Sequence, residues 1–212
     1  MKPWAGRVVV VTAGPTREPM DPVRFLTNAS TGRMGFCLAE AAKNLGAKVV
    51  LVSGPTCLED PRGVDVKRVT TAAEMRRAAL KSSSKADVFI AAAAVGDWRF
   101  ERVAPHKIKR EKKAVTVRLV PNPDIVAEVA RGSRRPRLVV GFALESRDIL
   151  ENARKKLASK NLDAVVANGL ETLGSSSARV DILYRDGGRD TLPARSKPAA
   201  ARAILGKLGE RL

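Results

Sequence analysis

Aromatic residues, histidine and cysteine are scarce in this sequence. Only 4% of the 212 residues are aromatic, the single histidine is His106, and neither Cys37 nor Cys57 lies in a C-x-x-C motif or beside a histidine. Stacking of single-stranded nucleic acid, a histidine-based zinc site and a Ser-His-Asp triad therefore lack most of the side chains that they need. We expect both cysteines to be buried or idle thiols.

Long apolar runs are also missing. None approaches the roughly 18 residues of a membrane-spanning helix, so we expect no membrane insertion. The basic N-terminus leads straight into a strand-like run, without the apolar stretch and cleavage site of a secretory signal. No Pro-, Gly- or Ser-rich linker divides the chain. We expect one domain over residues 1–212, located in the cytoplasm.

Basic residues are in clear excess. Lys and Arg number 39 against 22 Asp and Glu, which gives a formal net charge of +17. Such a charge favours polyanionic partners, which include nucleic acid, phosphorylated metabolites and nucleotides. The basic residues are spread over segments such as 74–85 and 130–137, a distribution that is equally typical of a solvated surface.

Strand-like and helix-like segments alternate along the chain. Apolar runs without period-two alternation, which are typical of strands buried on both faces, occupy residues 7–13, 47–54, 86–95, 137–143 and 162–168. Helical patterns lie between or after them, at residues 32–47, 70–83, 122–132 and 147–160. This alternation predicts an α/β fold with a doubly wound, mostly parallel, Rossmann-like sheet.

Local signals place several helix ends. Thr71 stands three residues before Glu74, the spacing of a capping box. The helix at 32–47 is predicted to bury a stripe that includes Leu45 and to end at Gly46. Pro123 is expected near the first turn of the helix at 122–132, behind Asn122.

Two segments depart from the alternation, and a last helix follows them. Residues 96–120 form an excursion that ends in the alternating sequence AVTVRLV, which predicts a protruding flap or hairpin. Residues 175–195 predict an antiparallel edge hairpin that turns at Asp186-Gly187-Gly188. Residues 196–212 have the pattern of a final amphipathic helix.

The first strand is not followed by the G-x-G-x-x-G of a dinucleotide-binding fold. A Pro-rich loop comes first, and Asn28, Ser30, Thr31, Gly32 and Gly35 then open the first helix. Ligands of open α/β sheets gather at this edge, and helix N-termini favour anions. Such a Ser/Thr-Gly sequence is more often simple helix capping, so on its own it does not assign a function.

Other patterns also suit an anionic ligand. The small residues at 91–95 let a flat base or sugar approach the backbone, with Asp97 at the end of the strand, although a tightly packed strand fits equally well. Lys107 and Lys109 point to one face if the chain is extended there. Lys156 and Lys160 lie one helical turn apart, a repulsive pair that a polyphosphate would stabilise. Such clusters of charged residues more often simply lie on a solvent-exposed surface.

Taken together, six segments resemble a known family over residues 6–210. In order, they are AGPTREPMDPVRFLTNASTGRMG, AAAAVGDWR, APHKIKR, NPDIVAEVA, VVGFALES and KKLASKNLDAVVAN. They are similar to bacterial phosphopantothenoylcysteine synthetase, the C-terminal half of the bifunctional flavoprotein of coenzyme A biosynthesis. The long loop joined to the [ST]-G-x-M-G helix start is the most specific of these features.

The resemblance implies a ligase that joins 4′-phosphopantothenate to L-cysteine. CTP would activate the carboxylate as an acyl-cytidylate with release of pyrophosphate, and the cysteine amine would then displace CMP. Mg²⁺ would arrive with CTP, and no certain metal ligands are assigned. The family's flavin-dependent decarboxylase half would precede residue 1, so we expect no flavin, with a decarboxylase partner in cis or in trans. A homodimer that shares its active sites is implied.

The resemblance also implies roles for particular residues. Asn28 and Lys107 match the catalytic positions that handle the acyl intermediate, and Arg110 replaces the last lysine of the family's K-x-K-K motif. The phosphopantothenate positions are Asn28, Ser30, Thr31 and Gly32. The nucleotide positions are Ala91, Ala92, Ala93, Asp97, Lys107, Pro123, Asp124, Ile125, Val126, Phe142, Lys156 and Lys160.

Two other functions remain open at this stage. An NAD(P)-binding oxidoreductase would use the same fold, although the missing fingerprint argues against hydride transfer. A basic nucleic-acid-binding module would explain the charge but not the motifs. We expect neither membrane nor nucleic acid to be a partner.

Overall fold

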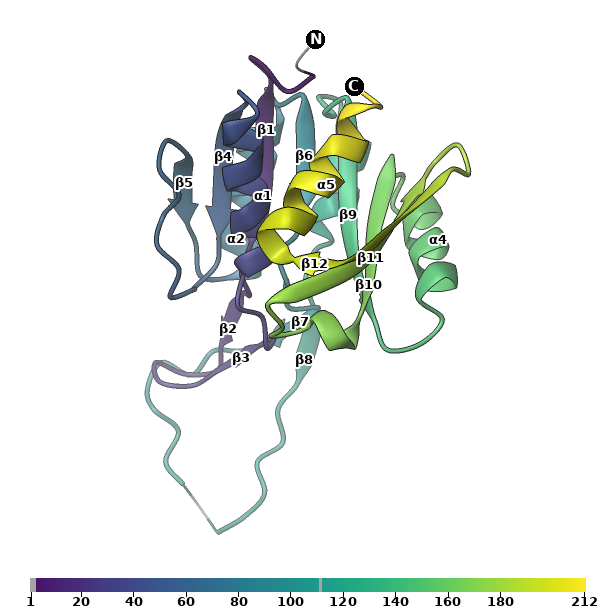
Figure 1. Cartoon of the computed structure of the whole chain (residues 1–212). Coiled ribbons are helices and arrows are strands. Elements are labelled where there is room, and N and C mark those ends of the chain that lie inside the picture. The colour runs from purple at the N-terminus through teal and green to yellow at the C-terminus, as the bar shows by residue number, and fades with distance from the viewer. Residues whose placement is uncertain (1–2, 111) are drawn as a thin grey trace.

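A mixed eight-stranded sheet forms the centre of the computed structural model, which describes residues 3–110 and 112–212 (Figure 1). The strand order is β12-β11-β10-β9-β6-β1-β4-β5. The strands are β1 (Val8–Ala13), β4 (Lys48–Ser53), β5 (Asp65–Arg68), β6 (Val88–Ala91), β9 (Leu138–Glu145), β10 (Ala164–Gly169), β11 (Ser177–Tyr184) and β12 (Arg189–Ser196). Neighbours from β5 to β10 are parallel, and β11 and β12 add an antiparallel edge. The predicted fold class is confirmed.

Within the described residues, five α-helices cover the two faces of the sheet. They are α1 (Arg33–Asn44), α2 (Ala72–Ser83), α3 (Ile125–Arg131), α4 (Ile149–Ser159) and α5 (Lys197–Gly209). Helices α1 and α5 pack on one face, and α2, α3 and α4 pack on the other. The layers therefore alternate helix, sheet and helix, as the doubly wound pattern predicts.

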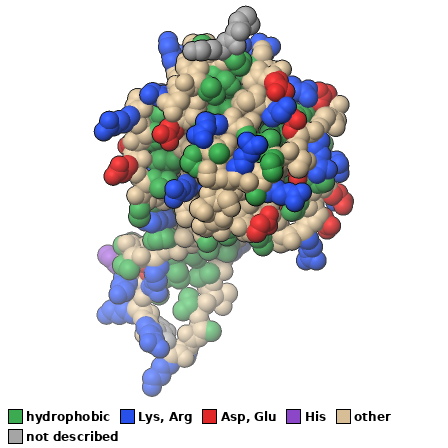
Figure 2. Space-filling view, in the orientation of Figure 1, with side chains coloured by type: hydrophobic (Ala, Val, Ile, Leu, Met, Phe, Trp, Pro, Cys, Tyr) green, Lys and Arg blue, Asp and Glu red, His purple; other side chains and the backbone are tan. Residues whose placement is uncertain are grey.

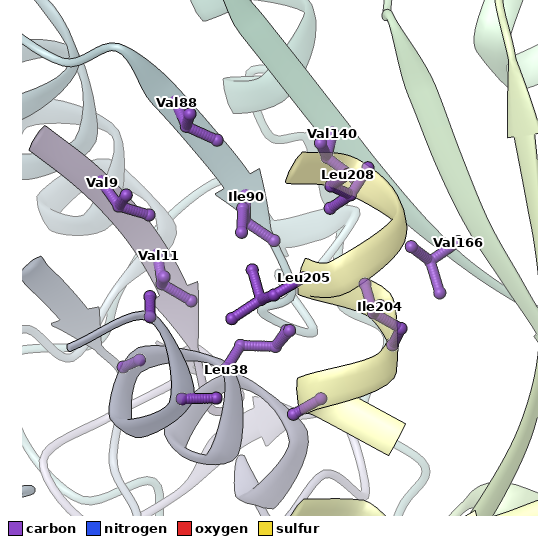
Figure 3. Packing of buried hydrophobic residues seen from close by; sticks show 14 of the residues in the cluster. Val9, Val11, Leu38, Val88, Ile90, Val140, Val166, Ile204, Leu205 and Leu208 are labelled. Atoms are coloured by element: carbon purple, nitrogen blue, oxygen red, sulfur yellow. The ribbon is translucent and has the colours of Figure 1, made fainter. Parts of the chain in front are cut away.

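Alternate residues of one strand enter two separate cores. Val9 and Val11 of β1 pack beneath α1 and α5, where Leu38 and Leu205 meet them (Figure 3), whereas Val10 joins the core on the opposite face. All five side chains are fully buried. A strand that is covered on both faces needs apolar residues at every position, which explains why the predicted strands show no alternation.

The helix-end signals are partly confirmed. Thr71 caps α2, and its hydroxyl accepts from the Glu74 N–H at 3.2 Å in a complete capping box. Gly46 follows α1 with φ +95°, the left-handed conformation that glycine tolerates. The prediction for Leu45 was wrong, because it lies past the last helical turn and is 38% exposed. Pro123 lies near the first turn of α3, as expected, directly before the N-cap Asp124.

The sequence patterns did not predict several short elements. Strand β5, the one-turn helix Leu170–Thr172 and the small hairpin of β2 (Arg17–Pro19) and β3 (Phe25–Thr27) were not predicted. Segments of three or four residues contain too few positions to reveal a period. Conversely, the predicted strand at 86–95 ends at Ala91, because the chain then leaves the ladder to contact the loop after β1.

The predicted flap is confirmed as a long excursion from the sheet (Figure 1). Its base is a short antiparallel pair, β7 (Trp98–Phe100) with β8 (Leu119–Pro121). The alternating sequence at 114–120 is mostly not a strand, because no neighbouring strand pairs with it in the described chain. Val115 and Val117 are 60% and 43% exposed, and basic side chains gather along the flap in Figure 2.

Within the part of the chain that the structure describes, no helix is both long and apolar enough to cross a membrane.

The predicted edge hairpin is confirmed, with Gly187 at φ +88° in the turn and the Tyr184 N–H donating to the Gly188 carbonyl at 3.0 Å. The predicted C-terminal helix is α5.

Candidate active site

A cavity of about 530 Å³ lies beside the carboxyl ends of β1, β6 and β9. The strand order reverses between β1 and β6, and such a switch point is where open α/β sheets bind their ligands. The cavity brings together many of the residues predicted from the sequence, which are Asn28, Ser30, Ala91, Ala93, Asp97, Pro123, Asp124, Ile125, Val126, Phe142, Lys156 and Lys160.

Asn28 is fixed at the edge of this cavity by two backbone carbonyls. Its amide nitrogen donates to the oxygens of Ala94 and Val95, both at 3.1 Å. Both amide hydrogens are thereby used, which leaves the side-chain oxygen for a ligand. Asn28 therefore presents a hydrogen-bond acceptor to whatever occupies the cavity.

Lys156 on α4 is a half-buried cation. Its ammonium donates to the Phe142 carbonyl at 2.6 Å. Burial and the neighbouring Lys160 ammonium lower the pKa of Lys156, against the opposing effect of nearby carboxylates that include Glu145 and Asp124. A ligand that brings negative charge would offset both unfavourable effects.

Lys160 pairs with the carboxylate that caps α3. Its ammonium lies 2.8 Å from Asp124, whose other oxygen accepts from the Ala127 N–H at 3.1 Å. Burial alone raises the pKa of Asp124, but the bonds from Lys160 and Ala127 outweigh it and the net pKa is lowered. An ionised pair thus lines one wall of the cavity.

The small residues after β6 bring the backbone close to the cavity. The Ala92 N–H donates to the Thr12 carbonyl at 3.2 Å, and the Ala93 N–H donates to the Thr12 hydroxyl at 3.3 Å. Ala91 and Ala93 line this cavity, whereas Ala92 faces a second one. Because these N–H groups are already bonded, contact with a ligand is left to the carbonyl oxygens.

The second cavity, of about 170 Å³, adjoins the first at the N-terminus of α1. Thr31, Gly32 and Ala92 line it rather than the larger cavity, and Ser30 and Phe142 line both. The α1 helix comes very close to β1 here: a Cβ atom on Gly35 would lie 2.5 Å from the Cβ of Ala13. The first helical turn is thereby held at the edge of the sheet.

Lys107 lies apart from both cavities. It is exposed on the flap, as are Lys109 and Arg110, and it lines neither cavity. Within one copy of the chain, the structure therefore does not bring Lys107 to Asn28. The flap residue that follows it, Ile108, is tied to Asp21 by a hydrogen bond of 3.1 Å.

Several lining residues were missed by sequence reasoning. Thr12, Asn122 and Gly141 line the larger cavity, and Asn168 and Lys197 line the smaller one. Asn122 and Asn168 belong to segments that carry the family resemblance, so they could have been found there. Lys197 is the first residue of the last helix, and no local sequence pattern marks it as a lining residue.

No group of three or more His, Cys, Asp or Glu side chains that could hold a metal ion occurs within residues 3–110 and 112–212. The larger cavity does contain two acidic residues, Asp97 and Asp124. The Asp124 carboxylate is already engaged by Lys160 and by the start of α3.

Fold and cavity define a Rossmann-like α/β protein with a cavity lined by Lys156 and Lys160 at the carboxyl edge of its parallel strands. The family described as DNA/pantothenate metabolism flavoprotein C-terminal domain matches residues 4–211, and the chain belongs to this family. The resemblance found in the sequence is confirmed.

The coenzyme A biosynthesis bifunctional proteins CoaBC are similar to this chain. The protein of Vibrio cholerae is 44% identical over 212 residues, which are 98% of this chain and 53% of that protein. The protein of Bacillus subtilis is 44% identical over 208 residues, 96% of this chain and 51% of that protein. The chain thus spans about half the length of these relatives.

A solved structure agrees. The crystal structure of the C-terminal domain of the coenzyme A biosynthesis bifunctional protein CoaBC is 36% identical, with a TM-score of 0.85. It covers 100% of this chain, which in turn covers 98% of that structure. The fold therefore extends over both chains nearly in full.

Proposed function

We propose that this chain joins 4′-phosphopantothenate to L-cysteine in coenzyme A biosynthesis, with CTP as the activating nucleotide. The observation that carries the proposal is the larger cavity, in which Lys156, Lys160 and Asn28 meet at the sheet's ligand-binding edge. The identity to coenzyme A biosynthesis proteins and the match to the C-terminal domain of one of them support it.

The chemistry requires charge neutralisation around a phosphate. The phosphopantothenate carboxylate attacks the α-phosphorus of CTP, which forms an acyl-cytidylate and expels pyrophosphate. The cysteine amine then attacks the acyl carbon, loses a proton and expels CMP. Fixed cations stabilise such steps because they face the charge as it develops. Lys156 and Lys160 supply them here, and Mg²⁺ enters with CTP as part of the substrate.

Backbone groups at Ala91 to Ala93 are assigned to the nucleotide base. With the N–H donors of Ala92 and Ala93 engaged by Thr12, carbonyl acceptors are what this strand end can offer. Cytosine carries an amino group that can donate a hydrogen bond to such a carbonyl. This complementarity supports CTP over a base that presents an acceptor at the same place.

Asn28 is assigned to the second step. Its free oxygen is an acceptor, suited to orient the attacking amine of cysteine beside the acyl carbon. Lys107 is assigned to the same intermediate, and because it stands away from the cavity of its own chain, it would act from the flap of a second copy.

Pyrophosphate release tests the proposed reaction. The protein is incubated with phosphopantothenate, cysteine, Mg²⁺ and each of the four nucleoside triphosphates in turn. We expect CTP to be used best, and release to require phosphopantothenate. Equal use of ATP or GTP would contradict the role given to residues 91–93, and no release with any nucleotide would overturn the ligase.

A matched pair of variants tests the role proposed for the cavity lysines Lys156 and Lys160. Lys160→Met removes a cavity ammonium and is expected to raise the KM for CTP about tenfold, the effect of losing one charged hydrogen bond. Lys155→Met removes the same charge from the same helix, but Lys155 is exposed and paired with Glu151 at 2.7 Å. It should leave the KM for CTP unchanged.

A further inference from the structure

Leu144 and Leu173 are large apolar side chains that lie partly exposed to solvent. Leu144 is 43% exposed and Leu173 is 45% exposed, and each of them lines both the larger and the smaller cavity. They belong to different elements, since Leu144 lies near the end of β9 and Leu173 directly follows the one-turn helix Leu170–Thr172. Two exposed leucines thus border the junction between the cavities.

Hydrogen bonds fix the backbone that carries both leucines. Next to Leu173, Thr172 is only 6% exposed, and its hydroxyl donates to the Gly169 carbonyl at 2.8 Å and accepts from the Asn168 amide. Leu144 of β9 is the neighbour of the same Asn168 in the parallel ladder. The two side chains are therefore held at the junction by a buried anchor and by the sheet.

The junction as a whole is mostly apolar. Besides the two leucines, the described residues that line both cavities are Ser30, Ala93, Ala94 and Phe142. The hydroxyl of Ser30 already accepts from the Gly32 N–H at 3.3 Å. Ordered water needs several polar partners, and this wall offers few. The junction therefore favours a dry contact with a ligand.

The proposed reaction forms a water-sensitive group in the larger cavity. The acyl-cytidylate is a mixed anhydride of a carboxylic and a phosphoric acid, and its acyl carbon is assigned to a place beside Asn28. Leu144 and Leu173 line the same cavity as Asn28. A bound intermediate would cover their exposed surface and displace water, which is favourable for apolar area. Enzymes that form reactive intermediates exclude water from them in this way.

We propose that Leu144 and Leu173 shield the acyl carbon of the intermediate, so that the cysteine amine rather than water takes the acyl group. The inference rests on the proposed function and concerns the fate of the intermediate, not its formation. Without the shield, a water oxygen attacks the acyl carbon, the bond from that carbon to the phosphate oxygen breaks, CMP leaves and a proton passes to solvent. Phosphopantothenate is regenerated, and CTP is consumed without product.

The ratio of pyrophosphate released to phosphopantothenoylcysteine formed, at low cysteine concentration, tests the shield. We expect a ratio of about one in the wild type and a several-fold higher ratio in Leu173→Ser and Leu144→Ser, because the smaller polar side chain admits water. In ¹⁸O-labelled water, the excess turnover should place the label in the phosphopantothenate carboxylate. Leu170→Ser is the control, because Leu170 lies in the same turn, is 50% exposed and is absent from the described lining of both cavities.

Three results would overturn the shield: an unchanged ratio in either leucine variant, an equal rise in Leu170→Ser, or label that enters CMP instead of the carboxylate. Far-UV spectra check the fold, and Leu173→Ala and Leu144→Ala take the place of a serine variant that does not fold. A wild type that forms no phosphopantothenoylcysteine would overturn the proposed function and the shield together. Variants that match a coupled wild type would overturn the shield alone, so the two failures are distinguishable.

Discussion

The buried carboxylate of Asp21 accepts a hydrogen bond from the backbone N–H of Ile108 at 3.1 Å, across 87 positions of sequence. Asp21 is only 2% exposed and also holds the Arg24 side chain, whose guanidinium donates to the Ile108 carbonyl at 2.7 Å. The turn between β2 and β3 therefore clamps the flap beside Lys107. The position of that lysine depends on a loop far from it in sequence.

Replacing Asp21 by Asn is expected to loosen the flap without unfolding the sheet. The amide cannot hold Arg24 as an ion pair, and charged hydrogen bonds are the stronger kind. Limited trypsin digestion should cut the Lys- and Arg-rich flap several-fold faster, while an unchanged far-UV spectrum shows that the sheet is still folded. Asp65→Asn, an exposed carboxylate on β5, is the control. Equal cleavage rates in the wild type and Asp21→Asn would contradict the clamp.

The clamp should survive mild acid. Burial by itself raises the pKa of Asp21, but hydrogen bonds from Arg24, Val23 and Ile108 outweigh it and hold the pKa well below its ordinary 3.8. A lowered pKa stabilises the fold above the unfolded-state value and loses that effect as pH falls through the folded value. The difference in unfolding free energy between wild type and Asp21→Asn should be constant from pH 7 to about 4 and shrink below it. A difference that disappears by pH 5 would show that the carboxylate is not held in this way.

Lys107→Gln is expected to separate the two half-reactions. The variant keeps a hydrogen-bonding chain of similar reach but removes the cation that the second step is proposed to use. Pyrophosphate should still be released from CTP and phosphopantothenate, little phosphopantothenoylcysteine should form, and the acyl-cytidylate should accumulate in mass spectra. Lys112→Gln, from the same flap, should react normally. Parallel loss of CTP binding and pyrophosphate release would reduce Lys107 to a nucleotide ligand.

The flap is expected to join two copies of the chain with C2 symmetry. Val115 and Val117 are exposed on a long excursion, and a second copy would cover them as an isologous interface. Light scattering at micromolar concentration should give a dimer, and Val117→Asp should shift it toward monomer and reduce activity while the far-UV spectrum is unchanged. A fully active wild-type monomer would rule out this arrangement.

Gly35→Ala tests the close approach of α1 to β1. The added Cβ would lie 2.5 Å from the Ala13 Cβ and 3.2 Å from the Thr12 carbonyl oxygen. We expect a loss of about 1–3 kcal/mol in the free energy of unfolding, the usual cost of overpacking a core. Gly206→Ala on α5 meets no atom within 4 Å and should instead stabilise the helix by up to about 1 kcal/mol. The two melting temperatures measure the contrast, and equal shifts would contradict it.

The layered fold could be predicted from the sequence alone. Val9, Val10 and Val11 are apolar in succession because the strand is covered on both faces, and local spacing records this requirement directly. The Thr71 and Glu74 capping box and the glycine turn at Gly187 are likewise local, since their hydrogen bonds and dihedral angles join residues near in sequence. The resemblance to the family then identified the candidate site residues by their positions in the shared motifs.

Tertiary structure alone decided which residues meet in the two cavities. Lys197 and Gly32 are brought to one cavity because α5 packs beside α1 on the same face of the sheet, a contact that no local period records. Lys107 carries a binding signal in the sequence, yet the clamp at Asp21 holds its segment away from the cavity of its own chain. Periodicity is set by neighbours within a few residues, whereas a cavity is set by the packing of whole elements, and only the folded chain determines that packing.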